Sequence, residues 1–164
     1  MYITTFSGHK NKPLDFSGLF QKATRTLDFL SPIGDLTLRC WVAYAFWVSG
    51  LTKIQNWDST LYLFQEEYSV PLLSPELAAY LGILVEVGFP VLLAFGFLGR
   101  FAALGLFLFN IVAVISYPDV GAAGLEMHKG WGVMLLVCFL HGPGKLSVDY
   151  WIKKHFFNAR TNHI

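Results

Sequence analysis

Residues 75–117 read PELAAYLGILVEVGFPVLLAFGFLGRFAALGLFLFNIVAVISY, and this stretch decides the fold of the chain. It holds two long apolar blocks, 75–97 and 100–117, which meet at a tight polar break formed by Gly99 and Arg100. A helix that crosses a bilayer needs about 20 mostly apolar residues, within a range of about 17 to 25. The stretch therefore predicts two membrane-spanning helices joined by a short turn.

The residues at the ends of these blocks support the assignment to helices. Ser74 suits the N-cap of the first block, Pro75 suits its first helical position, and Glu76 is an acidic residue in the first turn. Pro118 directly follows the second block, where it stops the helix.

Two further apolar blocks, 36–53 and 128–142, lie on either side of this pair. The later block is the weaker, because its strictly apolar part is short enough for a re-entrant or interfacial segment. Charge asymmetry favours a full crossing: with four spans and a cytoplasmic N-terminus, only Lys53 and Lys129 of the 12 Lys and Arg residues lie outside. We therefore predict an all-α, multi-pass membrane bundle of four helices with both termini in the cytoplasm.

Composition agrees with a membrane protein of one domain, residues 1–164. Hydrophobic residues make up 54% of the chain and charged residues 14%, against roughly 25% charged in soluble domains. The lipid bilayer is thus the expected partner of the apolar surface, and a net charge of +1 gives no basic face for nucleic acid. Cys40 and Cys138 form no CxxC motif. The polar stretch after Met1 predicts an uncleaved first span rather than a cleavable signal peptide.

Three segments outside the spans show apolar residues at helical spacing with charges between them. They are residues 16–30, 57–68 and 147–157. This pattern predicts amphipathic helices that lie at the membrane interface. Their simplest role is to anchor the bundle.

Glu86 is the most unusual residue of the predicted spans, because an acidic side chain in mid-bilayer costs roughly 2.5–3.5 kcal/mol. Asn110 falls at a matching depth in the third span, counted from the Gly99–Arg100 turn. We therefore predict a hydrogen bond between Glu86 and Asn110. Two interpretations stay open: a catalytic role in proton or quinone chemistry, or a polar contact that merely holds two helices together.

Four other residues are candidates for binding a cofactor. Trp47 and Trp131 fall near one level of the first and fourth spans, where they would either wall a slot for a flat ligand or simply pack. Ser49 and Lys53 end the first span near the outer surface. No cofactor is indicated beyond the possibility of a quinone.

The predicted outer and inner ends of the fourth span carry further polar residues. Glu126 and His128 are two potential ligands on one loop, which is too few for a metal site. At the inner end, Gly142 and Pro143 are predicted to end the helix, and either Ser147 or Asp149 to cap the C-terminal helix. Arg39 lies at the same face and is the expected partner of Asp149.

A set of residues between positions 36 and 149 forms a distinctive pattern. It consists of Arg39, Ser49, Gly50 and Lys53, then Glu86 and Gly96, then Arg100, and finally Gly142-Pro143-Gly144 with Ser147 and Asp149. This pattern resembles the DoxX family of small four-span bacterial membrane proteins. Val87 and Gly88 depart from it, since many members have a glycine pair there. His128, Trp131 and the later Gly-Pro-Gly-Lys-Leu-Ser stretch are similar to a branch found beside genes for metal-responsive, ribosomally made peptides.

The resemblance implies a protein of the bacterial cytoplasmic (inner) membrane, but leaves its activity open. Some relatives are small subunits of quinone-linked oxidoreductases, and others belong to oxidative-stress complexes. Our leading hypothesis is an accessory subunit of a quinone-linked redox system, with a partner subunit that supplies the electron-transfer cofactor. The alternative is a non-enzymatic membrane partner in copper stress or in the biosynthesis or export of a metal-binding peptide. A purely structural subunit and a homo-oligomer are further possibilities, and whether the chain is itself an enzyme stays open.

Overall fold

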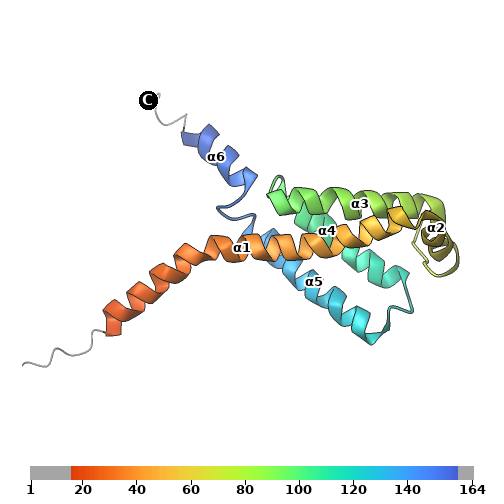
Figure 1. Ribbon diagram of the computed structural model, residues 1–164, viewed down its shortest axis with the longest axis horizontal. Helices are drawn as coiled ribbons and strands as arrows, with labels where there is room; N and C mark the ends of the chain where they lie inside the picture. The colour runs from red at the N-terminus through yellow and green to blue at the C-terminus, as the bar shows by residue number, and fades with distance from the viewer. Residues whose placement is uncertain (1–15, 159–164) are drawn as a thin grey trace, which may run out of the picture. The chain divides into compact units, whose positions relative to one another are not determined.

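The computed structural model describes residues 16–158, and every regular element in that part of the chain is an α-helix (Figure 1). The six helices are α1 (Phe16–Gln55), α2 (Trp57–Glu66), α3 (Pro75–Phe95), α4 (Gly99–Ser116), α5 (Gly121–His141) and α6 (Val148–Asn158). The predicted all-α class is therefore confirmed.

The chain forms two compact units, residues 1–31 and 32–164. The described part of the first unit is the N-terminal stretch of α1, where Phe20 and Phe29 are exposed. We predicted a surface helix and a separate first span, but the structure has one continuous helix of 40 residues. Pro32 lies inside it, where the proline ring removes one backbone hydrogen bond without ending the helix.

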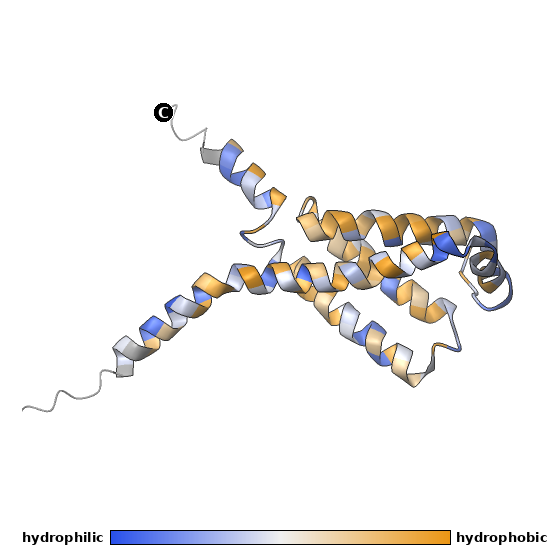
Figure 2. Ribbon diagram, viewed as in Figure 1, coloured by the Kyte–Doolittle hydropathy of each residue, from blue (hydrophilic) through white to orange (hydrophobic). Residues whose placement is uncertain are grey.

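Three helices of the described residues are long and apolar enough to cross a membrane: α3, α4 and α5. The weakest of the predicted apolar blocks, 128–142, belongs to one of these helices, because α5 begins at Gly121 and reaches 21 residues. The C-terminal half of α1 is not among them, since Arg39 and Lys53 lower its hydropathy. In Figure 2 most of the α3 ribbon is coloured hydrophobic, whereas the α1 ribbon mixes hydrophobic and hydrophilic residues along its length.

The core of the second unit lies where α1, α3, α4 and α5 meet. Small residues of α4, Ala102 and Ala103, are fully buried there and allow neighbouring helices to approach closely. The larger buried side chains of this core are Val42, Phe46, Leu93, Leu106 and Leu135. A smaller cluster packs α2 against α3 through Phe64, Ala78 and Ala79.

Both ends of α3 follow the sequence signals. Ser74 caps the first turn by accepting a hydrogen bond from the Leu77 amide at 3.4 Å, as predicted. At the other end Gly96 adopts a left-handed conformation with φ of 64°, which glycine tolerates without strain. Leu98 follows with φ of 50°, and α4 begins at Gly99.

Asp149 completes this turn from a distant part of the chain. Its Oδ1 accepts a hydrogen bond from the Leu98 amide at 2.9 Å, and its Oδ2 accepts one from the Gly99 amide at 2.8 Å. The Asp149 amide donates in return to the Gly96 carbonyl at 3.0 Å. Of the two predicted caps of α6, Ser147 is the one observed, accepting from the Tyr150 amide at 3.2 Å. Asp149 instead caps α4, where a carboxylate is favoured by the helix dipole.

The predicted pair of Arg39 and Asp149 is wrong. Arg39 is 1% exposed and donates through Nη2 to the Leu146 carbonyl at 2.6 Å. Its Nε and Nη1 have no hydrogen-bond partner among the described residues. The guanidinium lies against Gly96, at the C-terminal end of α3, where a cation interacts favourably with the unpaired carbonyls of the last turn.

Candidate functional site

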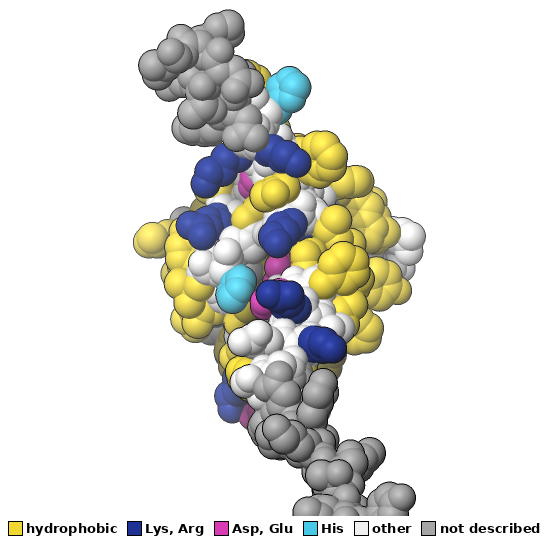
Figure 3. Space-filling model, turned by 90° about the vertical axis from the view of Figure 1, so that its left-hand side faces the viewer, with side chains coloured by type: hydrophobic (Ala, Val, Ile, Leu, Met, Phe, Trp, Pro, Cys, Tyr) yellow, Lys and Arg dark blue, Asp and Glu magenta, His cyan; other side chains and the backbone are white. Residues whose placement is uncertain are grey.

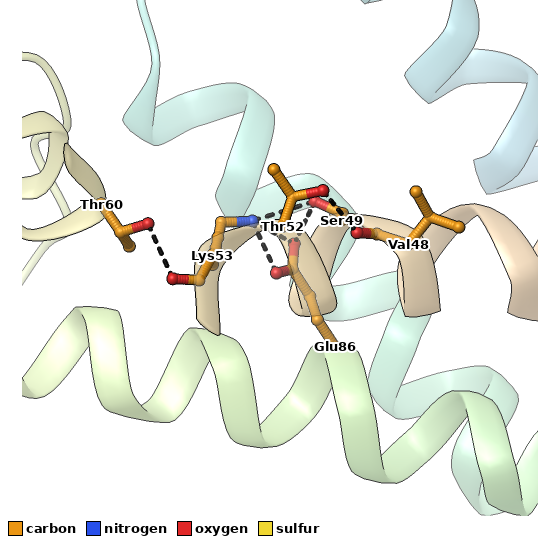
Figure 4. A network of polar contacts seen from close by, with 6 residues as sticks. All are labelled: Val48, Ser49, Thr52, Lys53, Thr60 and Glu86. Carbon is orange, nitrogen blue, oxygen red and sulfur yellow. Dashed lines mark hydrogen bonds and ion pairs between the residues drawn. The ribbon is translucent and has the colours of Figure 1, made fainter. Parts of the chain in front are cut away.

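The most heavily charged contact inside the bundle joins α1 to α3. Lys53 Nζ lies 2.5 Å from Oε2 and 2.7 Å from Oε1 of Glu86, and Ser49 Oγ donates to Oε1 at 3.1 Å (Figure 4). Ser49 and Lys53 are four residues apart, so they share one face of α1, and Lys53 Nζ also donates to Ser49 Oγ at 3.0 Å. Glu86 is only 4% exposed. The three side chains form one connected polar cluster in an apolar setting.

Gly50 is what allows α1 to come so close to Glu86. A Cβ atom at this position would lie 2.9 Å from Glu86 Cβ and 2.8 Å from Val87 Cγ2, which is closer than real side chains pack. On the other side of the cluster, the Thr60 hydroxyl of α2 donates to the Lys53 carbonyl at 3.1 Å. This bond satisfies a carbonyl that the end of α1 would otherwise leave free.

A cavity of about 150 Å³ adjoins the cluster. Lys53 and Glu86 form its polar wall, and Phe64, Tyr68 and Phe109 are prominent among its apolar lining. Ser116 also lines it, is 1% exposed, and has a hydroxyl with no hydrogen-bond partner among the described residues. A buried polar group without a partner is uncommon in proteins and calls for an explanation.

Tyr68 places a phenol at the same cavity from the connection between α2 and α3. Its ring stacks on Phe64 with centroids 4.7 Å apart and contacts Tyr117 with centroids 5.0 Å apart. Burial raises the pKa of the Tyr68 hydroxyl above its usual 10.0, and the nearby charge of Glu86 adds to the shift. Tyr68 is therefore neutral and able to donate a hydrogen bond at physiological pH.

A second polar pair joins α4 to α5. Asn110 Nδ2 donates to the His128 carbonyl at 2.9 Å, and Asn110 Oδ1 lies 2.7 Å from His128 Nδ1. That short contact places a proton on Nδ1, since the amide oxygen can only accept. We refer to these two groups of side chains, Ser49 with Lys53 and Glu86, and Asn110 with His128, together as the polar layer.

The predicted hydrogen bond between Glu86 and Asn110 is therefore wrong. Matching depth along two helices does not fix the direction in which each side chain points. Glu86 faces α1, where the long side chain of Lys53 reaches it, while Asn110 faces α5. The sequence carried a signal for the true partner, because Ser49, Gly50 and Lys53 combine polar groups with a small residue on one helix end.

The two tryptophans lie in different surroundings. Trp47 lines a shallow groove between α1 and α3 together with Tyr44 and Pro90. Trp131 packs on Phe46 with ring centroids 5.8 Å apart and on His128 at 5.0 Å. Neither residue lines the cavity beside Glu86. The residues that our sequence reasoning missed are Phe64, Tyr68, Phe109 and Ser116, none of which carries a distinctive motif.

The candidate metal ligands near the start of α5 are engaged with other groups. The Glu126 carboxylate pairs with Lys129 at 2.6 Å, and the His128 ring contacts Asn110. Across residues 16–158, no three His, Cys, Asp or Glu side chains gather where a metal ion could sit.

The long apolar helices and the buried polar layer between them define the class: this is a helical membrane protein. The family model for DoxX matches residues 34–118, which contain Lys53, Glu86, Asn110 and Ser116, and the chain belongs to the DoxX family. A protein of Haemophilus influenzae (strain ATCC 51907 / DSM 11121 / KW20 / Rd), described as an uncharacterized protein, is 35% identical over 133 residues. That alignment covers 76% of this chain and 86% of the relative. No solved structure matches the chain.

Proposed function

We propose that this chain is the membrane subunit of a redox system that uses the quinone pool, and that the cavity beside Glu86 binds the quinone head group. The observation that carries the proposal is the buried, unpartnered hydroxyl of Ser116 at an apolar cavity whose other polar wall is Lys53 and Glu86. A ligand with a polar oxygen on an apolar ring would satisfy that hydroxyl.

The dimensions and chemistry of the cavity suit such a ligand. A protein cavity of about 150 Å³ can hold one benzene ring. Phe64, Tyr68 and Phe109 offer aromatic contact to a ring of that size. A quinone has two carbonyl oxygens, which only accept hydrogen bonds, and the Ser116 hydroxyl and the Lys53 ammonium are donors.

Glu86 would exchange protons with the bound quinone, because reduction of a quinone to a quinol takes up two protons. The Lys53 ammonium and Ser49 hydroxyl would hold its carboxylate in position. In this proposal Asn110 does not hold Glu86, but orients His128 within the same polar layer. A partner subunit would supply the electrons.

The proposal includes a bundle of four spans, with residues 36–53 of α1 as the remaining one. Pairing with Glu86 supports this, since Lys53 is costly in lipid unless an opposite charge compensates it. With four spans, residues 1–164 would form one domain of the bacterial inner membrane with both termini in the cytoplasm. The N-terminal part of α1, α2 and α6 would then lie at the interfaces as amphipathic helices.

Binding of a short-chain ubiquinone, whose head group has a single ring, to the purified protein tests the proposal. Ser116→Ala removes the unpartnered hydroxyl without adding side-chain atoms to the cavity, and Glu86→Gln removes the acid. We expect both variants to bind at least tenfold more weakly, because a hydrogen bond to a buried group contributes about 1–1.5 kcal/mol or more. Thr37→Val is the matched control, since Thr37 donates only to the Ile33 carbonyl of its own helix. Equal affinities in all four proteins would overturn the proposal.

A further inference from the structure

A second cavity lies at the opposite end of α4, around the loop from α5 to α6. It has a volume of about 750 Å³ and is open to the surface. Its lining is basic: Arg100, Lys145 and Lys153 contribute cations and His141 a titratable ring, against the single carboxylate of Asp149. Figure 3 faces this end and shows Lys and Arg side chains around pale loop backbone, bordered by hydrophobic side chains.

The cations of this cavity are available to a ligand. Asp149 accepts hydrogen bonds from the amides of Leu98 and Gly99, and the Asp35 carboxylate lies beside Gly144 of the lining. The three cations therefore outnumber the carboxylates near the cavity. No carboxylate of residues 16–158 lies within ion-pair distance of Arg100, Lys145 or Lys153. The cavity therefore carries an excess of positive charge.

The loop backbone holds Arg100 in place. Its Nη2 donates to the Leu140 carbonyl at 3.3 Å, in the last turn of α5. Gly142 has a φ of 87°, and a Cβ there would lie 3.0 Å from Arg100 Nε, so the glycine leaves room for the guanidinium. A guanidinium fixed in this way can present its remaining donors to a phosphate as a planar fork.

Apolar side chains continue from the basic cavity onto the sides of the helices. Leu98 is 52% exposed and Phe101 is 59% exposed, and both line the cavity. A free phosphate ion would gain nothing from them, whereas the acyl chains of a lipid would cover them. Basic pockets at the ends of membrane helices are known binding sites for anionic lipid head groups.

From this arrangement we infer that the cavity formed by Arg100, Lys145 and Lys153 binds the phosphate head group of an anionic phospholipid, with Leu98 and Phe101 against its acyl chains. The site is independent of the proposed quinone cavity, with which it shares no lining residue.

Thermal unfolding of the delipidated protein in a neutral detergent tests the inference. Added phosphatidylglycerol is expected to raise the midpoint, while phosphatidylcholine and inorganic phosphate are not. In the triple variant Arg100→Gln, Lys145→Gln, Lys153→Gln, half-saturation should need more phosphatidylglycerol, by about fivefold for each charge removed. The lipid-free midpoint of each variant shows whether it folds, and Arg100→Lys alone keeps the charge and should keep most of the response.

The matched control removes three charges from outside the cavity: Lys22→Gln, Arg25→Gln and Lys154→Gln. This variant should respond to phosphatidylglycerol as the unmodified protein does. An equal response of the two triple variants, or an equal rise with phosphatidylcholine, would overturn the inference. A rise with inorganic phosphate alone would also overturn it, because the site would then bind free phosphate rather than lipid.

Discussion

The Lys53 ammonium contacts both carboxylate oxygens of Glu86, and through this contact the last turns of α1 are held against the middle of α3. The Lys53 side chain is 20% exposed and that of Glu86 is 6% exposed, so the acid depends on the pair more than the base does. Removal of one partner from a buried ion pair leaves a charge without compensation, which costs more than the pair itself contributes.

Lys53→Met and Glu86→Gln should each lower the stability of the protein. Breaking a fully buried pair costs about 3–5 kcal/mol, and this is the upper limit here because the Lys53 side chain is 20% exposed. The double variant should be more stable than the sum of the single effects indicates, because no charge is then left unpaired. Unfolding of the four proteins in detergent measures this coupling. If the two single effects simply add, the contact contributes nothing to folding.

Gly50→Ala should destabilise the protein by about 1–3 kcal/mol, because the added methyl group would overlap Val87 and Glu86. Gly88→Ala is the matched control, since nothing lies within 4 Å of a Cβ at that position. The control should be neutral or stabilising, because alanine is favoured over glycine inside a helix by up to about 1 kcal/mol. Thermal unfolding midpoints compare the two. A Gly50→Ala protein as stable as Gly88→Ala would show that α1 and α3 do not approach closely.

Asp149→Ala should cost about 1–2 kcal/mol, because it leaves the amides of Leu98 and Gly99 without their acceptors. Asp149→Asn keeps one side-chain oxygen, so its stability should lie between those of the unmodified protein and Asp149→Ala. Amide hydrogen exchange at Leu98 and Gly99 gives a local readout, and both amides should exchange faster in the alanine variant. Unchanged protection would mean that the turn is held without the carboxylate.

Alkaline pH should weaken the fold through Tyr68. Its pKa is raised in the folded protein, so the neutral phenol contributes stability below about pH 10, and this contribution is lost as the pH rises through the folded pKa. Tyr68→Phe cannot ionise and should lose less stability between about pH 9 and pH 11. Denaturant unfolding at both pH values measures the difference. Identical pH dependence of the two proteins would show that Tyr68 ionises as freely as in the unfolded chain.

The helices could be predicted from the sequence because hydropathy and end signals are local. Ser74, Pro75 and Gly96 mark the ends of α3 through groups within one turn of the helix. The same local signals misplaced the start of α5, since Gly121 precedes the strictly apolar part of that helix. They also separated two segments that the structure joins across Pro32.

The partners of buried polar side chains on neighbouring helices were harder to predict than the helices themselves. Glu86 and Asn110 were correctly expected to be buried polar residues, but their partners depend on the rotation of each helix about its axis. Hydropathy does not define that rotation when a helix is apolar on all sides. The lining of the cavity beside Glu86 could not be predicted for the same reason, because Phe64 lies on α2 whereas Phe109 and Ser116 lie on α4.

The Asp149 cap also bears on how the chain is assembled. The turn between α3 and α4 receives its final two hydrogen bonds from a residue about fifty positions further along the chain. This helical hairpin is therefore synthesised before the group that closes its turn. The turn can receive these two hydrogen bonds only after the beginning of α6 has been synthesised, so a chain truncated before Asp149 would lack them.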